Sequence, residues 1–130
     1  MTLENTIHTA YEAWSRRDVD ALLEVVHPES VARPILGANI GTSVYRGREG
    51  LREWFHDLHQ EWETFETTVT RIEEHGDRAL LTVQVHARGR ASGVVIDDAL
   101  YHLVEVRDGM IRRLEAFQDR DDAIAALEAT

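Results

Sequence analysis

The chain has 130 residues, 43% of them hydrophobic, and a formal net charge of −10. Its size predicts one domain over residues 1–130, and its negative charge argues against nucleic acid as a partner, because phosphates would be repelled. The absence of cysteine excludes disulfides and thiolate chemistry, and the absence of lysine excludes Schiff-base chemistry. No apolar run approaches the ~20 residues that cross a membrane, and no export signal is recognised, so we expect a cytoplasmic protein without membrane association.

The first half of the chain is predicted to be mainly helical. Apolar residues recur at helical spacing over residues 2–15, and Asp18 is a natural N-cap for a second, short helix that carries Val26 and ends before Pro28. A short strand is expected over residues 31–35, with an edge or a bend at Pro34. Residues 37–47 are expected to form a loop with a brief extended piece at 42–45. A third helix, over residues 48–63, carries an apolar stripe of five side chains: Leu51, Trp54, Phe55, Leu58 and Trp62.

The second half is predicted to form four long antiparallel strands. The first two are expected over residues 65–73 and 78–88, where apolar and polar residues alternate. The other two form a hairpin around Asp108-Gly109, a pair that tolerates the positive φ angles of a tight turn. A two-residue turn would set Tyr101 opposite Ala116 and His102 opposite Glu115, whereas one bulged residue would change every pairing. A short helix is expected over residues 121–128.

This order of elements predicts an α+β fold. Its curved antiparallel (mixed) β-sheet would wrap around three N-terminal helices and form a cone-shaped barrel with an internal pocket. Both faces of the long hairpin carry apolar residues. We therefore expect one face to be covered by the helices and the pocket, and the other by a second subunit.

Three segments resemble the SnoaL-like branch of the nuclear transport factor 2-like superfamily. They are YEAW followed by RDVDAL over residues 11–22, YRGREGLREWF over residues 45–55, and RDGMI over residues 107–111. The resemblance covers nearly the whole chain and implies the cone fold. It also implies a homodimer through the outer sheet face, as is common in bacterial members. It implies no single activity, because this superfamily includes polyketide cyclases, ketosteroid isomerases, epoxide hydrolases, dehydratases and non-catalytic binders.

The catalytic residues of those enzymes do not carry over intact. In the cyclases and epoxide hydrolases that the chain resembles, an acid–base aspartate lies seven residues beyond the glycine of the hairpin turn, and that position is Ala116 here. The general base of the steroid isomerases falls at Pro34 or a neighbour, and their two hydrogen-bond donors fall near Ala10 and Tyr101. An enzyme and a non-catalytic binder therefore both stay open.

Four residues are candidates for proton transfer or for hydrogen bonding to a ligand: Asp98, His102, Tyr11 and Tyr101. A histidine and a carboxylate in apolar surroundings suit acid–base chemistry, and tyrosines can donate to a carbonyl or an oxyanion. On a regular strand, Asp98 and His102 lie roughly 13 Å apart and cannot form a direct pair. The alternative is structural: a histidine hydrogen-bonded at an interface, an aspartate at a strand end and tyrosines bonded within the core.

A second set of residues is predicted to bind substrate. The aromatic side chains would form a wall for a flat, apolar ligand, although such stripes on helices are also typical of plain core. Arg33 would meet an anionic ligand group or pair with a carboxylate at the rim. The full set is Trp14, Arg33, Trp54, Phe55, Leu58, Trp62, Leu103, Leu114 and Ala116.

No metal and no cofactor are expected. His56 and His59 have a spacing typical of metal ligands, but His56 lies on the polar side of its helix and no third ligand is placed. The sequence predicts a protein that binds a small, largely apolar molecule. If it is an enzyme, we expect a cofactor-independent isomerase, cyclase, hydratase or epoxide hydrolase-like activity. The alternatives are a non-catalytic ligand-binding or sensing protein, which Ala116 favours, and a protein-interaction module.

Overall fold

A computed structural model describes residues 2–34 and 44–129 of the chain. Its six strands form one sheet in the order β2-β1-β6-β5-β4-β3, in which β1 and β6 run parallel and the other neighbours are antiparallel. The α+β class and the mixed sheet are confirmed. The strands are β1 Val26–Arg33, β2 Tyr45–Arg46, β3 Trp62–His75, β4 Arg78–Gly89, β5 Val95–Arg107 and β6 Met110–Phe117.

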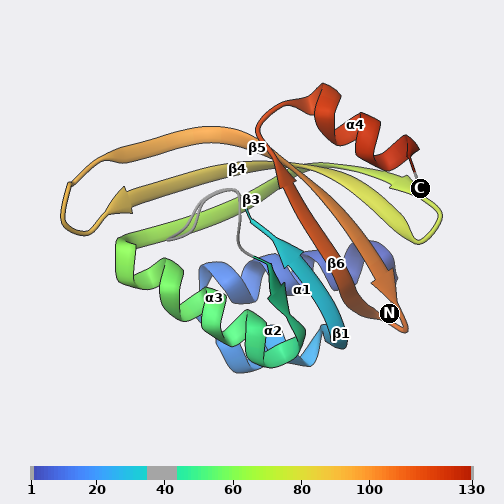
Figure 1. Ribbon diagram of the computed structural model, residues 1–130, viewed down its shortest axis with the longest axis horizontal. Helices are drawn as coiled ribbons and strands as arrows, with labels where there is room; N and C mark the ends of the chain where they lie inside the picture. The colour runs from blue at the N-terminus through green and yellow to red at the C-terminus, as the bar shows by residue number, and fades with distance from the viewer. Residues whose placement is uncertain (1, 35–43, 130) are drawn as a thin grey trace.

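The sheet arches over three helices, as Figure 1 shows. These are α1 Leu3–Ser15, α2 Val19–Glu24 and α3 Gly47–Glu61. The side chain of Asp18 accepts a hydrogen bond from the backbone N–H of Ala21, which confirms it as the N-cap of α2. The fourth helix, α4 Arg120–Glu128, lies on the opposite face of the sheet. The main core lies between the sheet and the first three helices.

A smaller core lies under α4. It contains Leu80 and Leu103 from the sheet and Ala123 and Leu127 from the helix. Two arginines hold the helix in place: Arg120 of α4 itself forms a bidentate pair with Glu73 of β3, with both N–O distances 2.8 Å, and Arg78 of β4 donates to the carbonyl of Leu127 at 2.9 Å. A helix of the same chain therefore covers part of the outer face that the sequence assigned to a second subunit.

The first strand begins earlier than expected. The second helix ends at Glu24 rather than carrying Val26, and β1 starts at Val26 and includes Pro28. The pairing of β1 with β6 shifts in register between Val26 and Val31. Pro28 lies inside this irregular stretch, where a strand tolerates the missing N–H of proline. Residue 35, the expected end of the strand, and residues 42 and 43 of the expected extended piece lie outside the described residues.

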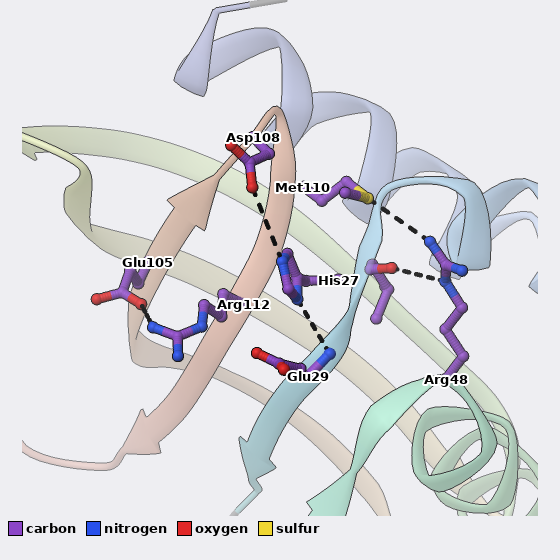
Figure 2. Close-up of polar contacts among 8 residues, drawn as sticks. His27, Glu29, Arg48, Glu105, Asp108, Met110 and Arg112 are labelled. Carbon is purple, nitrogen blue, oxygen red and sulfur yellow. Dashed lines mark hydrogen bonds and ion pairs between the residues drawn. The ribbon is translucent and has the colours of Figure 1, made fainter.

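The hairpin turn has the predicted conformation, with φ angles of 56° at Asp108 and 73° at Gly109. The strands do not pair as a two-residue turn without a bulge would place them, however. Arg112 is an extra residue between the pairs of β5 with β6, so the register shifts by one and His102 lies opposite Ala116. The bulged Arg112 is held by Glu105, with an N–O distance of 3.3 Å (Figure 2).

The end of α1 protects the long edge strand of the sheet. The hydroxyl of Ser15 accepts from the backbone N–H of Thr67 and donates to its carbonyl, both at 3.1 Å. Arg17 donates to the carbonyl of Glu63 farther along β3. Because an exposed strand edge is a template for pairing with another chain, these contacts close this part of β3 to such pairing.

Candidate functional site

A cavity of about 80 Å³ lies between the inner face of the sheet and the first three helices. One buried water site needs roughly 10–15 Å³, so the cavity has room for several waters or for a small ligand. Among the described residues that line it, none is charged at neutral pH and only four have polar side chains: Tyr11, Ser30, Thr67 and His102. The cavity is therefore a largely apolar compartment with a few polar positions.

Tyr11 and His102 form a buried polar pair in this cavity. The Oη atom of Tyr11 on α1 lies 2.5 Å from Nδ1 of His102 on β5, although 91 residues separate them in the sequence. Tyr11 and His102 are each only 8% exposed. The other ring nitrogen of His102, Nε2, has no hydrogen-bond partner in the described part of the chain, and the protein does not enclose it completely. This nitrogen is therefore open to a ligand.

Burial keeps both members of the pair neutral at neutral pH. It lowers the pKa of His102 from 6.5 to about 4 and raises the pKa of the Tyr11 hydroxyl. The hydroxyl of Tyr11 has no other partner among residues 2–34 and 44–129, so we assign its proton to the bond with Nδ1. The proton of the neutral imidazole then lies on Nε2. The pair thus presents an N–H donor to the cavity.

Aromatic rings form one wall of the cavity. The ring of Trp14 lies 4.7 Å from that of Trp54 and 5.5 Å from that of Phe55, measured between centroids. The indole N–H groups of Trp14, Trp54 and Trp62 are enclosed and have no partner within the described ranges. His59 binds the Phe55 carbonyl through Nδ1 at 2.8 Å, and burial lowers its pKa. The wall therefore offers packing surface to a ligand rather than hydrogen bonds.

Contacts at the hairpin turn fix the end of the cavity that Val26 and Ile111 line. The guanidinium of Arg48 on α3 donates to the carbonyl of Val26 at 2.9 Å and lies 3.6 Å from the sulfur of Met110 (Figure 2). The backbone N–H of Ile111 donates to the carbonyl of Val25 at 2.7 Å. Helix α3 and the hairpin are thereby joined to the first residues of β1.

A histidine on β1 strengthens this junction. Nδ1 of His27 accepts from the backbone N–H of Glu29 at 3.0 Å, so the ring proton lies on Nε2. Nε2 lies 3.9 Å from the carboxylate of Asp108 at the hairpin turn (Figure 2). The His27 side chain is thus held between β1 and the hairpin, outside the cavity lining.

The structure brings together two of the four candidates for hydrogen bonding or proton transfer. Tyr11 and His102 meet in the cavity, one residue away from the positions at Ala10 and Tyr101 that the resemblance to the steroid isomerases implied. Tyr101 does not line the cavity but packs against the small core under α4. Asp98 is exposed on β5, and it does not line the cavity.

Four of the predicted substrate-binding residues line the cavity: Trp14, Trp54, Leu114 and Ala116. The other five do not. Arg33 is exposed and pairs in register with Glu115 on the neighbouring strand, and Leu103 faces α4 because it alternates with His102. The remaining three belong to the core behind the wall: Phe55, Leu58 and Trp62.

Sequence reasoning missed several lining residues, of which Ser30 is the most important chemically. Ser30 is 8% exposed and lines the cavity from β1. No local pattern predicted it, because the expected strand began only at Val31. Leu22, Leu100 and Ile111, which were expected in apolar elements but not at the pocket, also line it.

Two further properties concern the described residues only. Within residues 2–34 and 44–129, no three histidine, aspartate or glutamate side chains are grouped so that they could hold a metal ion. In the same ranges, no helix has the length and apolar character that a membrane crossing requires.

The fold agrees with the comparison to known families. The model of the SnoaL-like domain matches residues 7–114. The chain belongs to the SnoaL-like family. Among curated proteins, none matches this SnoaL-like chain in sequence.

Solved structures with the same fold resemble the SnoaL-like chain over nearly its whole length. An NTF2-like protein from Burkholderia thailandensis has a TM-score of 0.79 at 21% identity and covers 98% of each chain. IdmH from Streptomyces antibioticus, a proposed polyketide cyclase, has a TM-score of 0.76 at 21% identity and covers 98% of this chain and 99% of its own. A proposed polyketide cyclase from Sinorhizobium meliloti has a TM-score of 0.71 at 22% identity, with 90% and 100% covered. At these identities the likeness establishes the fold alone.

Proposed function

We propose that this SnoaL-like protein binds a small, neutral, largely apolar molecule in its cavity, and that the Tyr11–His102 pair holds one oxygen atom of that molecule. The main observation that supports this proposal is the buried Tyr11–His102 pair. Its atoms lie 2.5 Å apart in a cavity whose other lining is nearly all apolar, and Nε2 of His102 is left without a partner among the described residues.

The energetics favour a neutral ligand with a hydrogen-bond acceptor. A buried donor without a partner costs about 1–3 kcal/mol, which a carbonyl or hydroxyl oxygen would recover on binding. The apolar lining contributes about 25 cal/mol for each Å² of ligand surface removed from water. An ionised ligand would be disfavoured, because the described lining offers no opposite charge to compensate its desolvation.

A second candidate function is cofactor-independent proton transfer of the isomerase, cyclase, hydratase or epoxide hydrolase type. A preorganised donor in a site that excludes water can stabilise an oxyanion as it forms. Two similar structures bear the names of proposed polyketide cyclases, which supports this candidate. A His102 pKa of about 4 makes the ring a weak base near neutral pH, so His102 would act as a donor. Ala116 supports non-catalytic binding or sensing instead.

Cyclohexanone, a neutral ring with one carbonyl, tests the proposal. We expect it to change the fluorescence of Trp14 and Trp54, which line the cavity. The substitution Tyr11→Phe should weaken its binding about tenfold, because loss of the hydroxyl frees Nδ1 to carry the ring proton and Nε2 no longer donates. The matched control is Tyr45→Phe, since Tyr45 is equally buried but donates to Asp57 and does not line the cavity.

The outcomes of this titration separate the candidates. Equal affinities of the wild type and Tyr11→Phe would contradict the assigned role of the pair, and no binding of cyclohexanone to the wild type would contradict the proposed function. Exchange of the α-protons of cyclohexanone for deuterium, followed by NMR, tests the catalytic candidate. Exchange no faster than in buffer would favour pure binding.

We also propose that the protein is a cytoplasmic homodimer that pairs through the outer sheet face. The part of this face beyond α4 has Val95 and Ala99 exposed on β5, beside half-buried Thr82 and Gln84 on β4. Light scattering at micromolar concentration should give twice the mass of the chain, 14.8 kDa. A monomeric mass would refute the dimer.

A further inference from the structure

Ser30 is a second polar group that is open to the cavity. It is 8% exposed, and it lines the cavity from β1. Its hydroxyl has no hydrogen-bond partner in the described part of the chain, and it is not one of the polar atoms that the protein encloses completely. A hydroxyl in this position gives up most of its hydration without a protein partner in return, which is unfavourable. A ligand oxygen would supply the missing partner.

Ser30 and the Tyr11–His102 pair lie in different parts of the cavity. His102 pairs with Ala116 on β6, whereas Ser30 precedes Val31, which pairs with Arg113 on the same strand. The two positions thus differ by about four residues along β6, or roughly 13 Å at about 3.3 Å per residue. They also lie on strands separated by β6, roughly 10 Å apart. The curvature of the sheet shortens the direct path between them.

The lining between these two polar positions is apolar. Leu114 of β6 lines the cavity between the levels of Ser30 and His102, and Leu51 of α3 lines it from the helical side. A ligand that reaches both polar positions must therefore have an apolar middle. Its ends must be neutral, since no charged side chain lines the cavity among the described residues.

We propose that Ser30 binds a second oxygen of the ligand, at the end remote from Tyr11–His102. This inference rests on the proposed function and narrows it. The ligand class becomes neutral, elongated molecules with an oxygen function at each end, such as diols, hydroxyketones or diketones. Both hydroxyl and carbonyl oxygens fit, because a serine hydroxyl can donate and accept.

Linear alcohols test this inference, because their two ends and their length can be changed separately. For each chain length, the affinity of the α,ω-diol is divided by that of the 1-alkanol, with Trp14 and Trp54 fluorescence as the readout. In the wild type this ratio should pass through a maximum at one length. The substitution Ser30→Ala should lower the ratio at that length about tenfold and should change the affinity of the 1-alkanol by less than about twofold.

Two controls keep the result interpretable. Ser92→Ala, in the exposed loop between β4 and β5, should leave the ratio unchanged. Ser30→Ala should unfold at the same temperature as the wild type or higher, because the hydroxyl that it removes has no hydrogen-bond partner among the described residues. A lower unfolding temperature would mean that Ser30 has a structural role and would overturn the inference.

The outcomes also separate this inference from the proposed function. Binding of 1-alkanols together with an unchanged ratio in Ser30→Ala would overturn the role of Ser30 and leave the proposed function standing. Binding of neither series would overturn both. A ratio that falls only in Ser30→Ala, at one chain length, is the result that this inference predicts.

Discussion

Acidification from about pH 7.5 to about pH 4.5 should lower the free energy of unfolding by about 2–3 kcal/mol through His102 alone. In the folded protein burial lowers the pKa of His102 to about 4, whereas the unfolded chain has the ordinary value of 6.5. Between these two values the unfolded state binds a proton that the folded state does not. The stability that His102 contributes is therefore fully present above pH 6.5 and is lost as the pH falls towards 4.

Urea unfolding of the wild type and of His102→Gln, measured across this pH range, checks this prediction. The variant should lack the share of the pH dependence that comes from His102. The exposed His8→Gln is the matched control and should keep the wild-type profile. His59 contributes in the same direction, because burial lowers its pKa as well, so some dependence should persist in His102→Gln. A profile of His102→Gln that coincides with that of the wild type would show that His102 is not buried in this way.

The substitution Ala116→Leu should reduce the affinity for cyclohexanone by about two orders of magnitude. Ala116 lines the cavity and lies opposite His102 on the neighbouring strand. A larger side chain here would occupy space that the ligand needs next to Nε2 of His102. Since the added atoms enter a cavity rather than a filled core, the usual overpacking cost of about 1–3 kcal/mol should not appear in the free energy of unfolding.

Ala91→Leu is the matched control for this substitution. Ala91 is exposed in the turn between β4 and β5, so the same change in side chain leaves the cavity intact. Isothermal titration with cyclohexanone should give wild-type affinity for Ala91→Leu. Wild-type affinity for Ala116→Leu would place the binding site elsewhere, whereas a fall in both variants would indicate a general effect on the fold.

Local sequence patterns predicted most of the fold. Asp108-Gly109 determines a turn with two positive φ angles whatever surrounds it, and the apolar stripe of α3 fixes the face that packs on the sheet. Pro28 was misleading, because its effect depends on the neighbouring strand. Where the pairing of β1 with β6 is irregular, a proline that would stop a helix is accepted inside β1.

The site was less predictable, because it depends on register. A single bulged residue, Arg112, decides that His102 lies opposite Ala116 and not opposite Glu115. The alternation along β5 indicated that Tyr101 and His102 face opposite sides, but not which side is the cavity. Tyr11 and His102 are in contact although they lie 91 residues apart in the sequence, and no local pattern predicts a contact over that sequence separation.

The most direct test of the cavity as a binding site is a crystal structure of the protein grown with cyclohexanone. We expect the ligand between the sheet and Trp54, with its carbonyl oxygen about 2.7–3.2 Å from Nε2 of His102. Ligand bound only outside this cavity, or bound inside it with the carbonyl turned away from Tyr11 and His102, would contradict the account.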